Sequence, residues 1–310
     1  MSQKPVLDAA TRLAITKAHL QTIRIPKAPP PGFNPLEATP EELKSYGIPT
    51  KPDVTTEPQR YEAWSKRVSK ARTFIPPQFT ILENHRNSAV QNSSTPANDA
   101  ATSSNWSGFV NTNPPAGPWT AVAGTWNVPN AALANPNPAG ATQWVAVWVG
   151  IDGWGNGDVF QAGTDTTVSQ GSGVNSFAWY EWYPANYVQL NNFPVSPGHE
   201  VYCEMQSLSG TTGTYNLQNQ TLGTYTSFEI SAPAGTAVKG ISAEWIVEDP
   251  GPGAPFPNYG SVTFTNLWQM SGGTWSNPPS TTTALTLVKD GTTLSQPSNL
   301  TNNSFKTTYV

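Results

Sequence analysis

Residues 177–184 read FAWYEWYP and set a single carboxylate, Glu181, among five aromatic rings. Aromatic residues favour β-strands, in which successive side chains point to opposite faces of the sheet. A strand would divide this stretch between two faces, with Trp179, Glu181 and Tyr183 on one and Ala178, Tyr180 and Trp182 on the other. Because only 12% of the chain is charged, a carboxylate in this aromatic surface is a candidate functional group whose partner must be sought elsewhere.

Short alternating runs of similar composition occur throughout the chain from residue 105 onward. Thr, Ser, Val, Trp and Tyr dominate these runs, and clusters of Gly, Pro and Asn separate them. Candidate strands are residues 108–112, 120–128, 142–151, 174–183, 200–208, 214–220, 224–230, 241–248 and 261–268. Many short strands at this spacing are typical of an antiparallel sandwich or barrel. The sequence therefore predicts an all-β domain over residues 105–310.

The first 86 residues have a different character and predict short helices separated by prolines. Apolar residues recur at helical spacing over residues 7–20. In ATPEEL, Thr39 is expected to be an N-cap, with Pro40 at the first helical position and Glu42 completing a capping box. A third helix is expected to begin at Pro58 and to carry a basic surface.

Residues 87–104 contain small and polar residues without periodicity. This composition indicates an exposed linker and a zone where the chain could be cleaved.

The net charge of −4 hides a strong asymmetry between these regions. Residues 1–86 contain 13 Lys and Arg against 8 Asp and Glu, whereas the remainder contains 3 Lys against 12 Asp and Glu. A basic leader and an acidic body are expected to attract each other. The interspersed acids and the absence of any nucleic-acid-binding motif argue against a nucleic-acid partner, and no apolar run approaches the ~20 residues of a membrane helix.

Several common catalytic chemistries are not supported by the residues present. Cys203 is the only cysteine, and its place in the alternating run EVYCEMQ predicts a buried core residue. The three histidines are scattered, and His199, the only one in the β domain, lies in a turn-like stretch. No zinc motif or nucleotide-binding loop is found, so we expect neither a metal nor another cofactor.

The search for a partner of Glu181 leads to a second carboxylate in apolar surroundings. Glu244, in ISAEWIVEDPG, shares a strand face with Ile246 and Glu248. Burial raises the pKa of a carboxyl group so that it can carry a proton in hydrolysis. From spacing alone, Glu181 and Glu244 are equally consistent with catalytic and with structural carboxylates.

Five motifs together resemble a known family. SNWSGFV at 104–110, WVGIDG at 148–153, VFQAG at 159–163, WYEWYP at 179–184 and AEWIVED at 243–249 occur in the order found in the glutamic peptidases called eqolisins. The resemblance covers about residues 104–270. It implies an antiparallel β-sandwich of two large, lectin-like sheets, and an acid-acting endopeptidase made as a precursor with a removable N-terminal prosegment.

Carried over motif by motif, the resemblance implies that Glu244 and Gln161 are the catalytic pair. It implies that Glu181 lies in the substrate cleft, together with the motif positions Trp106, Trp148, Asp152, Trp179 and Tyr183. Asp152 is expected to hydrogen-bond on the glutamate side of the pair. No metal or other cofactor is implied.

The resemblance also bears on processing, partners and location. Residues 1–86 become an inhibitory prosegment, 87–104 the processing zone, and 105–310 the peptidase domain of a monomer that acts on polypeptides. We expect the basic residues of the 57–86 segment to cover the acidic cleft near neutral pH and to release it on acidification. A secreted or extracytoplasmic location is expected, although the N-terminus shows no apolar block of the ~7–15 residues typical of a signal peptide.

Two alternatives fit the residues without the resemblance. A glycoside hydrolase could use Glu181 and Glu244 as its carboxylate pair. A carbohydrate-binding sandwich could use the aromatic residues alone, and would be indifferent to substitution of Gln161 or Glu244.

Overall fold

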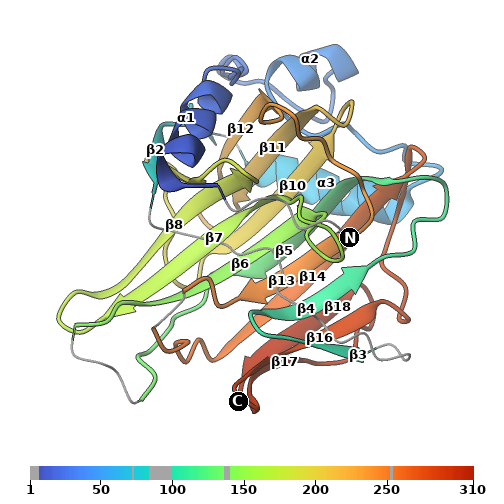
Figure 1. The fold of residues 1–310 in the computed structure, drawn as a ribbon. Coiled ribbons are helices and arrows are strands. Elements are labelled where there is room, and N and C mark those ends of the chain that lie inside the picture. Colours follow the sequence, from blue (N-terminus) through green and yellow to red (C-terminus); the bar gives the residue numbers. More distant parts are fainter. Residues whose placement is uncertain (1–6, 72, 84–99, 136–139, 252–253) are drawn as a thin grey trace.

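The computed structural model describes residues 7–71, 73–83, 100–135, 140–251 and 254–310. Its first part contains three helices, and the rest consists almost entirely of antiparallel strands (Figure 1). The helices are α1 (Ala9–Leu20), α2 (Pro40–Ser45) and α3 (Pro58–Lys70). The predicted helical leader is thus followed by an all-β body, as the sequence indicated.

The helices α1 and α2 begin where a side chain satisfies free backbone N–H groups. Asp8 precedes α1, and its carboxylate accepts a hydrogen bond from the Thr11 backbone N–H at 2.8 Å. At α2, the Thr39 hydroxyl accepts from the Glu42 N–H at 3.2 Å, while the Glu42 carboxylate accepts from the Thr39 N–H at 2.8 Å. The predicted capping box is therefore confirmed.

The strands form two layers. The first layer runs in the order β1 (Thr73–Phe74), β12 (Thr224–Ser231), β11 (Thr212–Asn219), β10 (Glu200–Ser207), β5 (Trp119–Asn127), β14 (Ser261–Ser271), with β15 (Thr274–Ser276) and β18 (Ser304–Tyr309) beside β14. The second runs in the order β16 (Thr283–Lys289), β4 (Trp106–Asn111), β13 (Ala243–Glu248), β6 (Gln143–Ile151), β7 (Phe160–Ser169), β8 (Gly173–Trp182), β9 (Tyr187–Leu190), β2 (Phe79–Leu82), with β3 (Ala100–Ser103) beside β16.

One strand joins the two layers into a single hydrogen-bonded sheet. β17 (Thr292–Pro297) pairs with β16 on one side and with β18 on the other. The predicted sandwich is confirmed, but its two layers are the halves of one continuous sheet of eighteen strands rather than two separate sheets.

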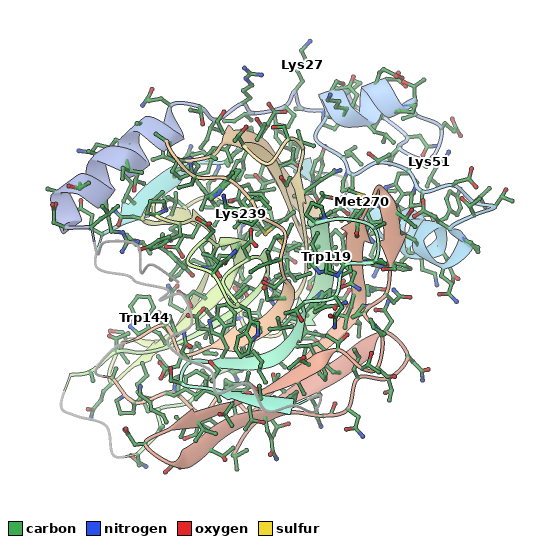
Figure 2. All side chains as sticks on the ribbon, turned by 45° about the vertical axis from the view of Figure 1, so that its right-hand side comes forward. Lys27, Lys51, Trp119, Trp144, Lys239 and Met270 are labelled. Carbon is green, nitrogen blue, oxygen red and sulfur yellow. The ribbon has the colours of Figure 1, made fainter. Side chains whose placement is uncertain are left out.

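The main hydrophobic core lies between the layers. Aromatic rings meet across it, as where Tyr180 of β8 lies 5.0 Å from Phe228 of β12 between ring centroids. Buried tryptophans also bond between layers, because the Trp126 Nε1–H donates to the Thr164 hydroxyl at 2.9 Å. Figure 2 shows the side chains filling this interior, with Trp119 inside and the leader residue Lys27 directed outward.

The predicted alternation of residues 177–184 is confirmed. Ala178, Tyr180 and Trp182 lie in the core between the layers. Trp179 lies on the opposite face of β8, in a separate buried cluster that also contains Trp106 and Trp148. The second layer therefore has a buried aromatic surface on its outer side, and this surface bears the candidate site.

The leader takes part in both layers. β1 pairs in parallel with β12 at one sheet edge, and β2 pairs with β9 at the other. α3 packs on the first layer through two arginines. The Arg67 guanidinium lies 3.6 Å from the centroid of the Tyr202 ring, and the Arg60 guanidinium lies 4.1 Å from the centroid of the Trp275 ring.

The predicted processing zone differs in part from the sequence analysis and lies in part outside the described residues. Most of the predicted processing zone at 87–104 falls outside the described residues, but its last part, Ala100–Ser103, forms β3 and pairs with β16. Strand structure thus begins before the predicted boundary at residue 105. Within the described ranges, no helix is long and apolar enough to cross a membrane.

Candidate active site

Strand pairing brings the two predicted catalytic residues to one row of the second layer. Glu244 on β13 pairs with Gly150 on β6, and Gly150 pairs with Gln161 on β7. Neighbouring strands lie ~4.8 Å apart, so the backbones at Glu244 and Gln161 are about 10 Å apart. Both side chains belong to the outer face, because they alternate with the inward-facing residues Trp245 and Ala162.

The residue between the pair is a glycine, and the Trp148 ring lies over it. A Cβ atom at Gly150 would lie 2.8 Å from the Trp148 ring and 3.2 Å from the Cβ of Gln161. Any side chain at this position would therefore force the Trp148 ring or Gln161 to move.

Glu181 continues the same row and fixes the amide of Gln161. The two residues are direct partners on β7 and β8, and the Gln161 Nε2–H donates to Glu181 Oε2 at 2.7 Å. One N–H of the amide is thereby used, and the second remains available. Gln161 Oε1 is buried and accepts no hydrogen bond from the described residues. Glu181 therefore determines which end of the amide is free to act.

Glu244 is fully buried, and neither carboxylate oxygen makes a hydrogen bond of good geometry within the described ranges. Burial raises the pKa of Glu244 well above its usual range; the nearby Ser242 side chain acts against this rise, and the charge of Asp152 adds to it. In the full-length chain this carboxyl group therefore holds its proton at pH values where an exposed glutamate is ionised. A neutral carboxyl group cannot act as a base.

The Glu244 carboxyl group should make the full-length chain less stable as the pH rises. In the unfolded chain it ionises near pH 4.5, whereas the folded chain keeps it protonated, so folding takes up a proton above pH 4.5. We expect Glu244→Gln to raise the free energy of unfolding at pH 7 by about 1.4 kcal/mol for each pH unit from 4.5 up to 7, or up to the folded pKa where that is lower, and to leave it unchanged at pH 3.

The measurement is thermal unfolding at both pH values, in a Gln161→Ala background, because Gln161 is the other predicted catalytic residue. Asp290→Asn, at an exposed turn, is the control for removing a carboxylate. An equal effect of Glu244→Gln at pH 3 and pH 7 would show that the folded pKa of Glu244 is not raised.

Asp152 organises the loop that leads into the Glu244 strand. Its carboxylate accepts hydrogen bonds from the backbone N–H groups of Lys239, Gly240 and Ile241 at 2.6, 3.1 and 3.0 Å, and from the Asn156 amide at 3.0 Å. These bonds hold Asp152 in the left-handed region at φ 69°. The expected hydrogen bond to Glu244 is not formed, because loop N–H groups and an amide occupy the Asp152 carboxylate. Asp152 therefore positions β13, the strand of Glu244, through the backbone of the loop.

The predicted tryptophans form the buried surface beside the row. Trp106 lies edge-on to Trp148, with 4.8 Å between ring centroids, and Trp179 stacks on Tyr187 at 4.1 Å. The Trp148 indole N–H donates to Glu248 at 2.8 Å. These rings are at most 1% exposed, so they support the floor of the site.

Two further carboxylates on this face, Glu248 and Asp165, were not among the predicted site residues. Glu248 is also bound by the Asn105 side chain at 3.2 Å, and Asp165 accepts a hydrogen bond from the Tyr187 hydroxyl at 3.0 Å. Burial raises the pKa of Glu248 well above its usual range. The signal for Glu248 was its even spacing from Glu244, and that for Asp165 was its even spacing from Gln161.

The profile of the peptidase A4 family matches residues 104–309. The chain belongs to the peptidase A4 family. It is 30% identical over 226 residues to aspergillopepsin-2 of Aspergillus niger, covering 67% of this chain and 78% of that relative. The crystal structure of scytalido-glutamic peptidase with a transition state analog inhibitor superimposes with a TM-score of 0.58 at 25% identity, covering 67% of this chain and 98% of that one. The crystal structure of aspergilloglutamic peptidase from Aspergillus niger gives a TM-score of 0.50 at 31% identity, covering 54% and 99%.

These matches confirm the resemblance to the eqolisins that the five motifs indicated. As a member of the A4 family, the chain is a glutamic endopeptidase, and polypeptides are its substrates. The match begins at residue 104, so the leader lies outside the family profile.

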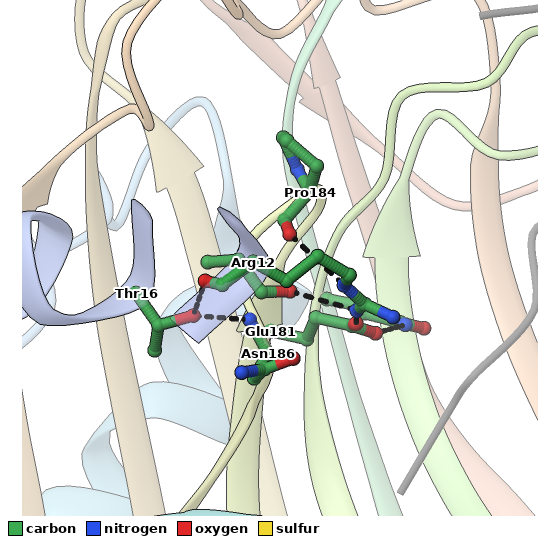
Figure 3. Close-up of polar contacts among 7 residues, drawn as sticks. Arg12, Thr16, Glu181, Pro184 and Asn186 are labelled. Atoms are coloured by element: carbon green, nitrogen blue, oxygen red, sulfur yellow. Dashed lines mark hydrogen bonds and ion pairs between the residues drawn. The ribbon is translucent and has the colours of Figure 1, made fainter. Parts of the chain in front are cut away.

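The leader of this A4 peptidase contacts the site through Arg12 of α1 (Figure 3). The Arg12 guanidinium lies 3.5 Å from Glu181 Oε1 and donates to the carbonyl oxygens of Pro184 and Ala185 at 3.3 and 3.2 Å. The central carbon of the Arg12 guanidinium lies 5.6 Å from the centroid of the Tyr183 ring. Tyr183 is half-buried. Arg12 therefore occupies the space beside the residue that orients Gln161.

The expectation for the 57–86 segment is corrected by these contacts. Among the described residues of that segment, Arg60 and Arg67 stack on rings of the first layer, because α3 packs there. Lys66 pairs with Glu62 within α3 at 2.6 Å. The leader cation that reaches the predicted cleft belongs to α1.

Proposed function

We propose that the endopeptidase acts in acid through a Gln161/Glu244 dyad. The observation that carries this proposal is the row Glu244–Gly150–Gln161, which sets a carboxyl group and an oriented amide on either side of a glycine. Glu244 as carboxylate would take a proton from the attacking water and pass it to the leaving nitrogen. The free N–H of Gln161 would donate to the oxyanion, while its Oε1 would accept from the water.

The reaction then proceeds by direct attack of water on the peptide carbonyl. Neither side chain forms a covalent bond with the substrate, so a tetrahedral intermediate forms without an acyl-enzyme. Glu181 keeps the amide in one orientation, and Asp152 holds the backbone from which Glu244 projects. In this proposal Trp106, Trp148, Trp179 and Tyr183 line or support the substrate cleft.

We further propose that the full-length chain is an inactive precursor inhibited by its own leader. Glu244 and Gln161 are at most 1% exposed, so a polypeptide does not reach them in this form. Arg12 covers the side chain that orients Gln161. Burial also leaves Glu244 protonated, and removal of the leader would hydrate the carboxyl group and lower its pKa toward the ordinary acid range.

The geometry favours this function over the two alternatives. Glu181 and Glu244 are separated by three strand spacings, about 14 Å between backbones, and the Gln161 side chain lies between them. Glycosidase carboxylates lie roughly 5–9.5 Å apart. A carbohydrate-binding surface needs exposed rings, whereas the three tryptophans of this face are buried.

The test of the proposed function is proteolysis of denatured casein by the purified full-length chain from pH 2 to 7. We expect no cleavage at pH 7, self-processing and casein cleavage below about pH 5, and no inhibition by pepstatin. A Glu244→Gln chain should remain intact and inactive throughout. Cleavage by that variant at the wild-type rate would place the chemistry elsewhere. The monomeric state and the secreted or extracytoplasmic location stay predictions.

A further inference from the structure

His19 lies in the last turn of α1 and is enclosed by the body of the protein. Only 3% of the residue is exposed. Its ring centroid lies 6.1 Å from that of Tyr180 and 6.2 Å from that of Trp182, both on β8. The chain that follows α1 pairs with β12, where Arg24 and Glu229 exchange two backbone hydrogen bonds. α1 therefore covers the end of the sandwich between β8 and β12 (Figure 1). The ring of His19 packs against Tyr180 and Trp182, which belong to the core.

The site of His19 suits a neutral ring and disfavours a charged one. Neither ring nitrogen has a hydrogen-bond partner within the parts of the chain that the structure describes. Burial lowers the pKa of His19 to about 4, and the Ser231 backbone, which acts in the opposite direction, does not offset it. Protonation would therefore place a cation among aromatic rings, where the Ser231 backbone does not compensate for the loss of water.

Charged groups on the surrounding elements do not remove this cost. α1 itself carries the cations Arg12 and Lys17. The carboxylates on β8 and β12, Glu181 and Glu229, are paired with Arg12 and Arg24 at 3.5 Å. Tyr180 is the titratable ring in contact, and burial raises its pKa well above the usual range, so it stays neutral.

The same helix carries the contacts that reach the active site. Arg12 pairs with Glu181, and the Thr16 hydroxyl accepts a hydrogen bond from the Asn186 N–H at 2.6 Å (Figure 3). Arg12, Thr16 and His19 are all at most 9% exposed. Because they lie on one short helix, displacement of His19 would also withdraw Arg12 from Glu181.

We propose that His19 is an acid sensor whose protonation releases α1 from the catalytic domain. The ring stays neutral and buried near neutral pH, and α1 remains docked. In acid the proton is bound in the released state, where water solvates the imidazolium. The link from release to activity rests on the inhibitory leader proposed above, whereas release itself can be measured without catalysis.

The direction of the effect follows from the two pKa values. Above pH 6.5 the ring is neutral whether α1 is docked or released, so His19 contributes no pH dependence. Between pH 6.5 and about 4 only the released ring binds a proton, and docking weakens as the pH falls. With 6.5 for the free ring and about 4 for the docked one, the docking equilibrium falls by up to roughly 300-fold.

The experiment measures hydrogen exchange of the amides of residues 9–20 between pH 7 and 3, corrected for intrinsic exchange. It uses the full-length chain carrying Glu244→Gln, so that no self-cleavage occurs. We expect protection of α1 to fall by at least 100-fold across this range. His19→Phe, which keeps an aromatic ring but cannot bind a proton, should remove most of that fall. His199→Gln, at the loop histidine that contacts Asn219, should leave the fall unchanged.

Two results would overturn the proposal. One is protection of α1 that persists down to pH 3 in the parent chain, which carries only Glu244→Gln. The other is an equal loss of α1 protection in the His19→Phe chain, which would assign release to the Arg12–Glu181 pair alone. An NMR titration of the histidine ring carbons in the parent chain gives an answer without mutation of His19. A His19 midpoint near 4 that coincides with loss of α1 protection supports the sensor, and a midpoint above 6 excludes it.

Discussion

Glu244→Gln is expected to lower kcat/KM for a polypeptide by at least ~10³. The glutamine keeps the shape of the side chain but cannot take a proton from water, and a general base contributes ~10²–10⁴. In this mechanism Glu244 also returns the proton to the leaving nitrogen, so one substitution removes both steps. The structure should persist, because the amide has the shape of the carboxyl group and this group makes no hydrogen bond of good geometry within the described residues.

The measurement compares initial rates on denatured casein at the acid optimum, using chains whose folding is checked by circular dichroism. Gln161→Ala should lose ~10²–10³, the usual effect of removing one oxyanion donor. The double variant should be little worse than Glu244→Gln alone, because the two residues act as a unit. Asp290→Asn serves as the control and should retain full activity. A Glu244→Gln chain within ten-fold of wild type would refute the dyad.

The local patterns of the sequence predicted much of the fold. Alternation in FAWYEWYP placed Tyr180 and Trp179 on opposite faces of a strand, and the residues of ATPEEL predicted a capping box that is present. These predictions succeeded because they depend on neighbours in the chain. The strand Phe160–Ser169, which carries Gln161, was not among the candidate strands. Its Thr- and Val-rich alternation was the available signal.

The C-terminal strands show a second kind of missed local signal. Asp290-Gly291 joins β16 to β17 with both residues at positive φ, 51° and 78°. An Asp-Gly pair between alternating runs is a strong indication of a hairpin. That hairpin is what carries the chain from one layer to the other, and it explains why the sandwich is one continuous sheet.

The arrangement of the site depended on contacts that no local pattern contains. Arg12 and Glu181 are far apart in the chain, and their pairing follows from the docking of α1 at the end of β8. The leader's charge predicted attraction to the body, but charge alone did not identify the helix that reaches the cleft. In α3 the arginines stack on rings instead, a choice that depends on the shape of the first layer.

The role of Gly150 also became visible only through strand register. Within WVGIDG the glycine has no evident partner, but β13 and β7 flank its strand and place Glu244 and Gln161 on either side of it. Gly150→Val is therefore expected to lower kcat/KM by at least about 10³, since its side chain would collide with the Trp148 ring and the Cβ of Gln161 and would move the amide away from its position opposite Glu244.

Stability alone would not account for such a loss. Extra methyl groups in a packed site usually cost about 1–3 kcal/mol, and Ala146→Val tests this contribution because Ala146 is a buried residue on the same strand and face. It pairs with Glu248 and Asp165, outside the catalytic row. We expect both variants to lose a similar few degrees in Tm, while only Gly150→Val loses activity in the casein assay. If the valine at position 150 leaves activity within ten-fold of the Ala146→Val chain, the reacting groups do not meet over Gly150, and the dyad must act from another position.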